Sequence, residues 1–389
     1  MSALAIDNIG LLMTNDPGLG TVRDAALVME EGLVSAVERA GVAVDQRIDA
    51  GGRCVIPGFV DSHTHLVFAG DRGEEFAARM AGASYAAGGI NVTVAATREA
   101  SSDELRRLAD ARRREALRAG ITHLEIKSGY ALDVKGEQRL CELAGEVTDD
   151  VTYLGAHLVP PEFADRADDY VAVVCGEMLA ACAPHARWID VFCERGAFDA
   201  DQSRAVLSAG REAGLGLRVH ANQLGPGPGV ALGVEMGAAS ADHCTYLSDA
   251  DVDALAGSET VATLLPATDF STRQPYPDAR RLLDAGATVA IATNCNPGSS
   301  YTTSMSFCIA LAVREMRMTA EEAVLAATLG GSKALRRTDV GRLTVGARAD
   351  AVMLAAPSYA HLVYRPGVPL VAATIAGGEV GWLDLELMR

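Results

Sequence analysis

The chain has 389 residues, of which 49% are hydrophobic and 22% are charged. This composition supports a large buried core, and it excludes intrinsic disorder, a collagen-like repeat and a coiled coil as descriptions of the whole chain. The net charge of −17 argues against a general surface for nucleic acid or for an anionic membrane, so we expect neither partner. An anionic small-molecule substrate would therefore need a cation placed locally.

The two ends of the chain predict strands rather than helices. Residues 1–54 and 341–389 contain short apolar runs separated by turn sequences such as Gly51-Gly52. Because neither segment holds enough strand to bury a sheet alone, we expect one small β-sandwich domain built from both ends. Residues 55–340 would then form a separate domain between them.

The segment between the ends alternates between strand-like and helix-like runs. Helix-like stretches at residues 102–119, 201–213 and 278–285 each lead into an Ala-Gly pair, with the glycine placed for a helix C-cap. Eight strands alternating with helices predict the α/β class and a (β/α)8 TIM-like barrel. The first interval is about twice the others, so we expect residues 67–97 to form an inserted loop over the site. The strand-like runs begin near Val55, Thr122, Val151, Trp188, Leu217, Ala239, Val261 and Thr288.

The start of the chain and its cysteines indicate the compartment. The first residues lack a basic segment and a long apolar core, and no run reaches the about 18 apolar residues of a membrane span. The eight cysteines are scattered without a C-x-x-C pair, which favours reduced thiols over a disulfide framework. We therefore expect no signal peptide, no membrane partner and a cytoplasmic protein.

Histidines follow several predicted strands at the barrel end where active sites lie. His63 and His65 come directly after the first strand, and two residues at this spacing on an extended chain point to the same side. Such a pair suits one metal ion, and neutral imidazoles favour Zn²⁺ first and Fe²⁺ as the alternative. Because a bound metal lowers the pKa of water from 15.7 to about 7, we predict hydrolysis at a carbonyl or amidine carbon. Three further histidines end predicted strands, namely His157, His220 and His243, whereas His123, His185 and His361 are expected to be structural or on the surface.

The segment Val55-Ile-Pro-Gly-Phe-Val-Asp-Ser-His-Thr-His65 resembles the metal-binding signature of the amidohydrolase superfamily. Further motifs resemble the imidazolonepropionase family over nearly the whole chain. These are Gly70-Asp-Arg72, Ala96-Thr-Arg-Glu-Ala100, Glu125-Ile-Lys-Ser-Gly-Tyr130, Leu154-Gly-Ala-His-Leu-Val-Pro-Pro161, Asp190-Val-Phe-Cys-Glu194, His220-Ala-Asn-Gln223, Ala241-Asp-His243 and Asn296-Pro-Gly-Ser299. The resemblance implies hydrolysis of 4-imidazolone-5-propanoate to N-formimidoyl-L-glutamate in histidine degradation. It also implies one divalent metal ion per chain and a homodimer.

The resemblance also assigns roles to single residues. The metal ligands would be His63, His65 and His220, with Asn294 at the position of a fourth ligand. The catalytic set would be His243, Asn294 and Gln223, with His243 transferring protons because an imidazole titrates in the useful range. Arg72 suits the propanoate carboxylate because its guanidinium binds carboxylates through two parallel hydrogen bonds. The full set of substrate contacts would be Arg72, Tyr85, Tyr130, His157, Gln223, Asn296, Gly298 and Ser299.

Asn294 departs from the family pattern, which has aspartate at this position as the last metal ligand. An amide oxygen can coordinate a metal, but it carries no charge and is a poor base. Three explanations stay open: a natural variant in which His243 moves the proton, an engineered substitution, or an impaired protein. Lys127 lies near a strand end where binuclear relatives carry a carboxylated lysine, and here we expect a salt bridge instead.

Two alternative functions remain open from the sequence. One is another ring-acting amidohydrolase, such as a cyclic-imide hydrolase or a deaminase. A deaminase substrate without a carboxylate would leave Arg72 nothing to bind, and ammonia release would distinguish the two chemistries. The other is a binding protein that has the barrel fold and binds a metal weakly, but is catalytically impaired because Asn294 replaces aspartate.

Overall fold

The structure, a computed structural model, describes residues 3–82 and 89–388. The chain divides into two compact units, one comprising Met1–Ser62, Arg114–His123 and Ser304–Arg389 and the other His63–Arg113 and Leu124–Thr303. The domain limits expected from the sequence, 54/55 and 340/341, stay a prediction. Within the described residues, no helix has both the length and the hydrophobicity needed to cross a bilayer.

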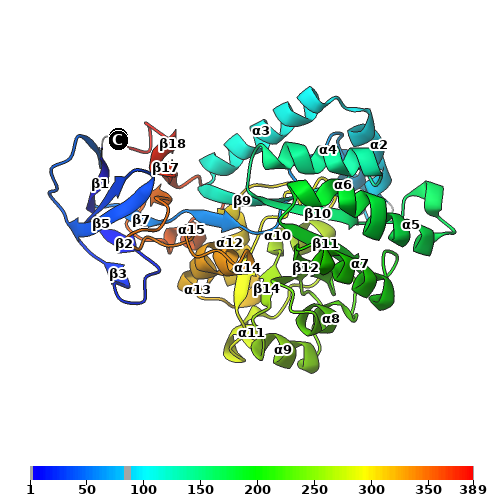
Figure 1. Cartoon of the computed structure of the whole chain (residues 1–389). Coiled ribbons are helices and arrows are strands. Elements are labelled where there is room, and N and C mark those ends of the chain that lie inside the picture. The colour runs from blue at the N-terminus through cyan, green and yellow to red at the C-terminus, as the bar shows by residue number, and fades with distance from the viewer. Residues whose placement is uncertain (1–2, 83–88, 389) are drawn as a thin grey trace. The chain divides into compact units, whose positions relative to one another are not determined.

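An eight-stranded parallel sheet carries the site (Figure 1). Seven of the eight strands begin within one residue of the predicted positions, which confirms the predicted (β/α)8 TIM-like barrel. The strands, in sheet order, are β15 (Val289–Ile291), β14 (Val261–Leu264), β13 (Ser240–His243), β12 (Gly216–Ala221), β11 (Trp188–Cys193), β10 (Asp150–Ala156), β9 (Ile121–Lys127) and β8 (Phe59–Asp61).

The first predicted strand is wrong in one respect. The run from Val55 to Val60 is two strands, because β7 (Cys54–Pro57) pairs with β16 in a different sheet and only β8 enters the barrel. Pro57 ends β7, and a Cβ on Gly58 would lie 2.1 Å from Thr122 Oγ1. The chain can therefore pass from one sheet to the other here only with a glycine.

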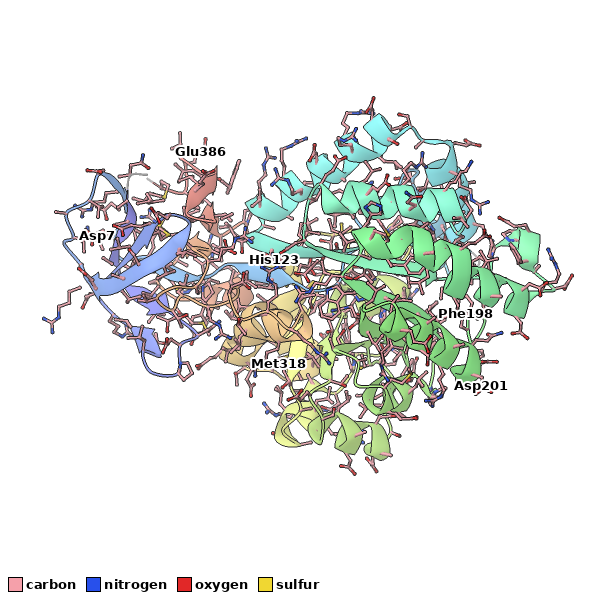
Figure 2. The ribbon with its side chains drawn as sticks, in the orientation of Figure 1. Asp7, His123, Phe198, Asp201, Met318 and Glu386 are labelled. Atoms are coloured by element: carbon pink, nitrogen blue, oxygen red, sulfur yellow. The ribbon has the colours of Figure 1, made fainter. Side chains whose placement is uncertain are left out.

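Helices follow the strands and pack on them, as α4 does on β10, α7 on β11 and α8 on β12 (Figure 1). The glycines predicted to follow three of the helices, Gly120, Gly214 and Gly286, all have positive φ angles of 83–89°, as a helix C-cap requires. The helices of this part of the chain are α3 (Ser102–Arg118), α4 (Val134–Gly145), α5 (Ala167–Val173), α6 (Leu179–Cys182), α7 (Ala200–Glu212), α8 (Gly229–Glu235), α9 (Asp249–Ala256), α10 (Pro266–Thr272) and α11 (Ala279–Asp284). Short turns of other helix types, η2 (Pro161–Phe163), η3 (Val174–Met178) and η4 (Ala183–His185), flank α5 and α6. Side chains fill the space among these elements (Figure 2).

The segment predicted as an inserted loop contains two helices, α1 (Gly73–Met80) and α2 (Ile90–Glu99). The first turn of α1 carries Glu74 and Glu75 and its last turn carries Arg79. Acidic residues at the start and a basic residue at the end of a helix oppose its dipole. This charge pattern could have revealed α1 from the sequence.

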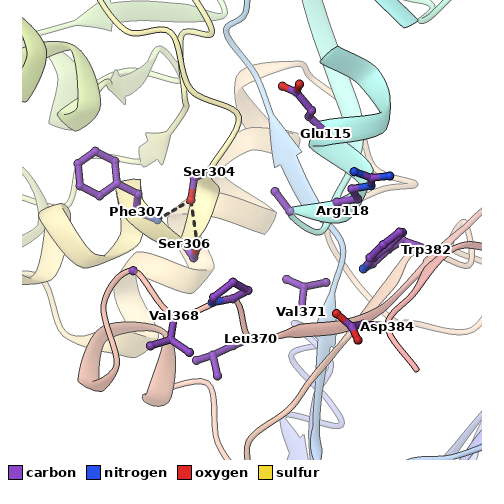
Figure 3. A pocket seen from close by; sticks show the side chains of 13 residues that line it. Glu115, Arg118, Ser304, Ser306, Phe307, Val368, Leu370, Val371, Trp382 and Asp384 are labelled. Atoms are coloured by element: carbon purple, nitrogen blue, oxygen red, sulfur yellow. Dashed lines mark hydrogen bonds between the residues drawn. The ribbon is translucent and has the colours of Figure 1, made fainter. Parts of the chain in front are cut away.

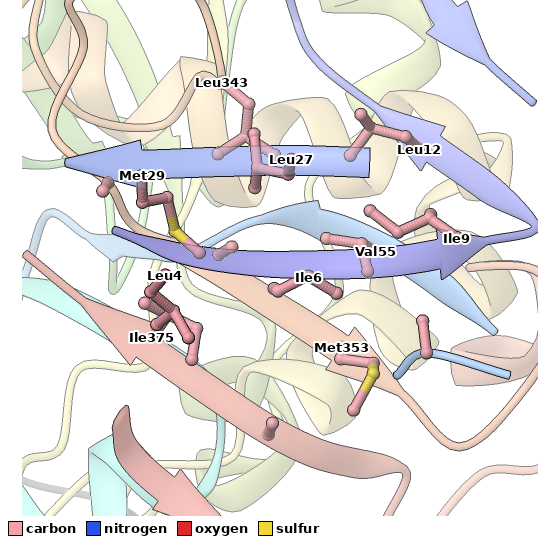
Figure 4. Packing of buried hydrophobic residues seen from close by; sticks show 14 of the residues in the cluster. Leu4, Ile6, Ile9, Leu12, Leu27, Met29, Val55, Leu343, Met353 and Ile375 are labelled. Carbon is pink, nitrogen blue, oxygen red and sulfur yellow. The ribbon is translucent and has the colours of Figure 1, made fainter. Parts of the chain in front are cut away.

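The two ends of the chain form two sheets around one apolar core. A four-stranded sheet has the order β5-β4-β1-β6, and a six-stranded sheet has the order β18-β17-β16-β7-β2-β3, so that the second sheet joins strands from both ends as predicted. Ile6, Leu27, Val55 and Met353 all lie in the shared core and are fully buried (Figure 4). The strands are β1 (Leu4–Ile9), β2 (Leu11–Met13), β3 (Thr21–Val22), β4 (Ala25–Glu30), β5 (Leu33–Arg39), β6 (Gln46–Asp49), β16 (Ala351–Leu354), β17 (Val371–Ala376) and β18 (Glu379–Leu383).

The same unit contains helices and a groove. Its helices include α13 (Ala320–Leu325), the π-helical turn η5 (Ala326–Gly330) and α14 (Gly331–Ala334), which follow α12 (Met305–Met316) and precede α15 (His361–Tyr364). A groove of about 430 Å³ lies between the end of α3, the start of α12 and the last strands, and Phe307, Val371 and Trp382 line it (Figure 3). None of the residues predicted to bind metal or substrate borders this groove.

All eight cysteines are free thiols, and all but Cys175 are buried. This confirms the expectation that the chain has no disulfide framework.

Candidate metal and active site

The barrel closes at the site itself. The backbone N–H of Asn294 donates to the His63 carbonyl (3.0 Å), and the N–H of His65 donates to the Asn294 carbonyl (3.1 Å). The segment after β8 therefore pairs with the segment after β15, through a parallel bridge between Thr64 and Asn294. Asn294 has a φ angle of +72°, a conformation that asparagine tolerates better than most residues. This pairing places the side chains of His63, His65 and Asn294 at the same end of the barrel.

Three histidines from two barrel strands gather at this end. One ring nitrogen from each of His63, His65 and His220 lies within 4.8 Å of the corresponding nitrogens of the other two. The ring centroids of His63 and His220 are 4.6 Å apart, and all three side chains are buried. The structure therefore brings together the three histidines that the sequence predicted as metal ligands.

The unpaired atoms of this cluster test whether a cation fits. His63 Nε2 and both ring nitrogens of His65 are buried and have no hydrogen-bond partner among the described residues. Buried polar atoms without partners are rare in folded proteins, because each costs free energy unless an ion or water satisfies it. Three imidazoles with available nitrogens form a set that suits a divalent transition-metal ion, and the cluster is a candidate site for one.

Two carboxylates contact ring nitrogens of His63 and His220 and orient these rings. His63 Nδ1 donates to Asp242 Oδ2 over 2.7 Å, which directs Nε2 away from Asp242 and into the cluster. Asp190 Oδ2 lies 3.1 Å from His220 Nδ1, close enough for an ion pair but not aligned as a hydrogen bond. A carboxylate behind a metal-binding histidine fixes the ring and raises its basicity. Asp190 and Asp242 therefore act on the candidate ligands rather than as ligands themselves.

A buried ionic network lies beneath the histidines. Lys127 Nζ donates to Glu125 Oε1 and to Asp190 Oδ2, each over 2.8 Å. Arg218 Nη2 donates to Asp242 Oδ2 over 3.2 Å, and Glu125 also accepts from the Thr64 N–H over 3.0 Å. Three carboxylates and two cations leave one net negative charge before any metal is counted, which favours a cation in the cluster above.

The pKa shifts follow from burial and pairing. Burial works to lower the pKa of Lys127, but Asp190 and Glu125 outweigh it, so the pKa is raised. Lys127 pairs with Glu125 and Asp190 and is a salt-bridge partner, as expected. Burial acts to raise the pKa of Asp242, but Arg218 and His63 hold it well below its ordinary value. Burial and, to a smaller degree, Lys127 lower the pKa of His63 well below its usual range, as the neutral form of a ligand requires.

Asn294 has its amide oriented by two hydroxyl groups. Its Nδ2 donates to Thr268 Oγ1 over 2.8 Å and to Ser299 Oγ over 3.0 Å. Its Oδ1 is buried and accepts no hydrogen bond within residues 3–82 and 89–388. The oxygen, which is the only atom of this amide able to bind a cation, is therefore the atom left available.

His243 lies beside the cluster but is not bonded to Asp242. Its ring centroid is 5.5 Å from that of His63 and 5.3 Å from that of His220. Asp242 pairs with His63 and Arg218 instead. His243 Nδ1 is buried and has no hydrogen-bond partner in the described part of the chain.

Arg72 is buried next to the loop that holds Gly298. Its Nε and Nη2 donate to the two carboxylate oxygens of Glu75 over 2.7 and 2.8 Å. A Cβ on Gly298 would lie 1.9 Å from Arg72 Nη1, so only glycine permits this packing. The guanidinium thus has an acidic partner that the sequence did not predict.

The loop from Asn296 to Ser299 forms a local turn. The backbone N–H groups of Gly298 and Ser299 both donate to Asn296 Oδ1, over 2.9 and 3.2 Å. These donors close a local turn rather than an anion cradle. The part of Asn296, Gly298 and Ser299 in substrate binding stays a prediction.

A small cavity adjoins the histidine cluster. Arg72, Tyr130, His157 and Asn296 line it, and its volume of about 20 Å³ holds about one water molecule, so the substrate enters only if side chains move. The His157 ring stacks on the His65 ring with centroids 5.4 Å apart, and burial, followed by His220, lowers the pKa of His157 to about 3. Gln223 is also buried, and its backbone N–H donates to Glu194 Oε2 over 2.9 Å.

Several residues that the sequence did not single out lie at the site. Tyr85 lies outside the described residues. The sequence motifs contained Glu125, Asp190 and Asp242 without assigning them a role, although their positions on or beside barrel strands were a usable signal. Glu75 was missed because a glutamate three residues after an arginine is common on any helix.

The chain was compared with known protein families and structures. The model of the amidohydrolase family matches residues 194–381. An imidazolonepropionase from Salinispora arenicola (strain CNS-205) is 67% identical over 97% of this chain and 98% of its own length. Another, from Mycolicibacterium smegmatis, is 63% identical over the full length of both chains.

Solved structures show the same fold at low sequence identity. The atrazine chlorohydrolase TrzN from Arthrobacter aurescens TC1, complexed with zinc, has a TM-score of 0.73 at 18% identity and covers 99% of this chain and 98% of its own. An adenosine deaminase from Xanthomonas campestris with bound zinc has a TM-score of 0.74 at 17% identity, covering 98% of this chain and 93% of its own. The fold, the histidine cluster and the full-length relatives lead to one conclusion: the chain belongs to the imidazolonepropionase family of amidohydrolases, which are enzymes of histidine degradation.

Proposed function

We propose that the chain hydrolyses 4-imidazolone-5-propanoate to N-formimidoyl-L-glutamate with a metal site built from His63, His65 and His220. The observation that carries this proposal is the convergence of three buried imidazoles at the mouth of the barrel, where His63 and His65 have ring nitrogens without a hydrogen-bond partner among the described residues. The membership of the imidazolonepropionase family supplies the substrate.

The metal would be Zn²⁺, with Fe²⁺ as the alternative, because both accept neutral imidazole nitrogen. His63, His65 and His220 would hold it, and Asn294 Oδ1 would be the fourth ligand from this chain. A metal ion bound there lowers the pKa of water and polarises a carbonyl oxygen, which is the chemistry needed for amide hydrolysis.

The side chains around the small cavity would hold the substrate. Arg72 would bind the propanoate carboxylate, since a guanidinium and a carboxylate pair through charge-assisted hydrogen bonds. Tyr130 and His157 line the cavity beside it and would contact the imidazolone ring, with Gln223 at the opposite edge. Tyr85 and the loop residues Asn296, Gly298 and Ser299 complete the proposed contacts.

His243 would move the proton. The oxygen of water adds to the ring carbonyl carbon and the C–N bond of the cyclic amide breaks, so that one proton must pass from the water to the departing nitrogen. A neutral imidazole whose Nδ1 has no protein partner can accept that proton and return it. Asn294 carries no charge and is not a base, so the proton transfer falls to His243.

The test is an assay of imidazolonepropanoate loss, with the metal content quantified on the same sample. We expect turnover in proportion to bound metal and no release of ammonia, which a deaminase reaction would produce. A fully metal-loaded protein that binds the substrate without turnover would contradict the proposal. The homodimer and the cytoplasmic location expected from the sequence remain predictions, and size-exclusion chromatography with light scattering tests the first.

A further inference from the structure

Arg72 and Glu75 form a tightly defined pair on the first turn of α1. The Nε and Nη2 atoms of Arg72 each donate to a separate oxygen of Glu75, over 2.7 and 2.8 Å. The Arg72 side chain is 4% exposed and that of Glu75 is 33% exposed. A bidentate pair of this kind fixes the plane of the guanidinium as well as its position.

Two glycines make room for the guanidinium. A Cβ on Gly298 would lie 1.9 Å from Arg72 Nη1, and a Cβ on Gly89 would lie 2.4 Å from Arg72 Nη2 and 2.7 Å from Glu75 Oε2. Backbone therefore packs against both Nη atoms of the fork. Any other residue at either position would displace Arg72.

A second buried arginine holds the same glutamate. Arg79 Nη2 contacts Glu75 Oε1 at 3.3 Å and donates to the Gly298 carbonyl over 2.7 Å. Arg79 Nη1 donates to the Ser271 carbonyl over 3.2 Å. The cluster of Arg72, Glu75 and Arg79 thus ties α1 to the loop at Gly298, and it carries one net positive charge.

Arg72 borders two cavities. It lines the small cavity with Tyr130 and His157, and it lines an outer cavity of about 280 Å³ with Phe76 and Tyr301. A cation in this place can meet the carboxylate of a substrate that reaches the histidine cluster. Its orientation then decides where that carboxylate lies relative to the ring.

We propose that Glu75 is a positioning residue that fixes the Arg72 guanidinium for recognition of the substrate carboxylate, with Arg79 holding Glu75 in place. This inference rests on the proposed function, in which Arg72 binds the propanoate group. Glu75 acts through geometry rather than through its charge alone, because its charge by itself opposes an anionic substrate. It thereby makes the enzyme specific for an imidazolone that carries a carboxylate on its side chain.

The experiment compares KM and kcat for imidazolonepropanoate and for the corresponding propanamide, which has the same ring without the charge. Glu75→Gln should raise KM for the propanoate about tenfold, with kcat within about twofold, and should change KM for the propanamide by less than about twofold. Glu75→Asp keeps the charge but is shorter by one methylene, so it should raise KM for the propanoate by a similar factor. Glu74→Gln removes the same charge from an exposed neighbour on α1 and is the matched control, with no expected change.

The outcomes separate this inference from the proposed function. An unchanged or lowered KM in both Glu75 variants, or an equal loss for the two substrates, would overturn the positioning role. If Glu75→Gln does not fold, as judged by circular dichroism, Glu75→Asp decides alone, because its retained charge keeps Arg72 and Arg79 paired in the interior. If the wild type does not turn over imidazolonepropanoate, or Arg72→Lys leaves KM unchanged, the proposed function fails before Glu75 is considered.

Discussion

The core of the terminal sheets and the barrel mouth both consist of buried side chains, but of opposite kinds. The core of the sheets is built mainly from apolar residues, such as Ile6 and Met353. The barrel mouth buries Lys127, Arg218 and the carboxylates that pair with them. In the first region each side chain contributes separately, whereas in the second the removal of one ion takes a partner away from charges that stay buried.

This difference predicts how mutations act. Shortening an apolar side chain costs the free energy of the lost contacts and of the cavity that remains. Removing one ion from a buried pair costs more, because the partner charge stays buried without compensation. The barrel mouth is therefore the region more sensitive to mutation, and its buried charges are the ones that orient the histidines.

The largest effect is expected on catalysis, from His243→Ala. Loss of a group that transfers protons lowers the rate by about 10² to 10⁴-fold, and we expect kcat to fall within that range while the metal content stays unchanged. The assay of imidazolonepropanoate loss measures it, and His185→Ala, at an exposed histidine, is the control. Full activity in His243→Ala would remove the proton-transfer role.

Lys127→Met should lower the free energy of unfolding by about 3–5 kcal/mol, because Glu125 and Asp190 lose their shared cation in a buried place. Urea denaturation followed by circular dichroism measures this change. Lys135→Met removes an exposed lysine and should stay within about 0.5 kcal/mol of the wild type. Equal effects of the two substitutions would show that the ionic network does not stabilise the barrel.

The stability of the metal-free protein should fall as the pH drops below about 6.5. His157 has a pKa of about 3 when folded against an ordinary value of 6.5, so the folded state binds fewer protons in this range and stability is lost toward acid. From pH 6.5 to 5.0 this one histidine contributes about 2 kcal/mol. His157→Gln should flatten the pH dependence of the unfolding free energy, measured with a chelator present, and an unchanged slope would exclude His157 as its source.

Asn294→Asp should raise metal affinity about tenfold, which equals about 1.4 kcal/mol, because a carboxylate adds a negative charge at the cluster. Thr268 and Ser299 can turn their hydroxyl protons toward the new oxygen, so the local packing is kept. Competition with a chromogenic chelator measures the affinity. A lower affinity in the variant would mean that position 294 does not face the metal.

The smallest effect is expected in the apolar core. Ile6→Val should cost about 1 kcal/mol, because one methylene is lost among residues that can partly close the gap. Urea denaturation compares it directly with Lys127→Met. A cost as large as that of Lys127→Met would mean that the apolar core and the ionic network are equally sensitive to mutation.

Much of the fold could be predicted from the sequence because each strand and helix has a local sequence pattern. The strand starts and the glycines after the helices were predicted closely, since alternation and C-caps depend on neighbouring residues. The strand near Val55 was misjudged because only tertiary pairing shows that β7 and β8 belong to different sheets. The helices α1 and α2 are not predicted, because the extra length of this segment indicates an insertion but not its secondary structure.

A site residue could be predicted where it belongs to a sequence motif, but not where its role depends on a tertiary contact. His63, His65 and His220 lie together as expected. The partner of Arg72 and the turn that engages the N–H groups of Gly298 and Ser299 depend on distances that no spacing in the sequence encodes. The pairing of Asp242 with His63 joins residues 179 positions apart, so it too required the fold.

The central claim is that three imidazoles hold one divalent metal ion. The most direct test is the metal content per chain after reconstitution with Zn²⁺ and removal of free metal, measured by atomic emission for the wild type and for His220→Ala. The account predicts one ion per wild-type chain and a large loss in His220→Ala, because that histidine alone brings a ligand from β12 to the pair after β8. A His220→Ala protein that retains a full ion per chain would contradict it.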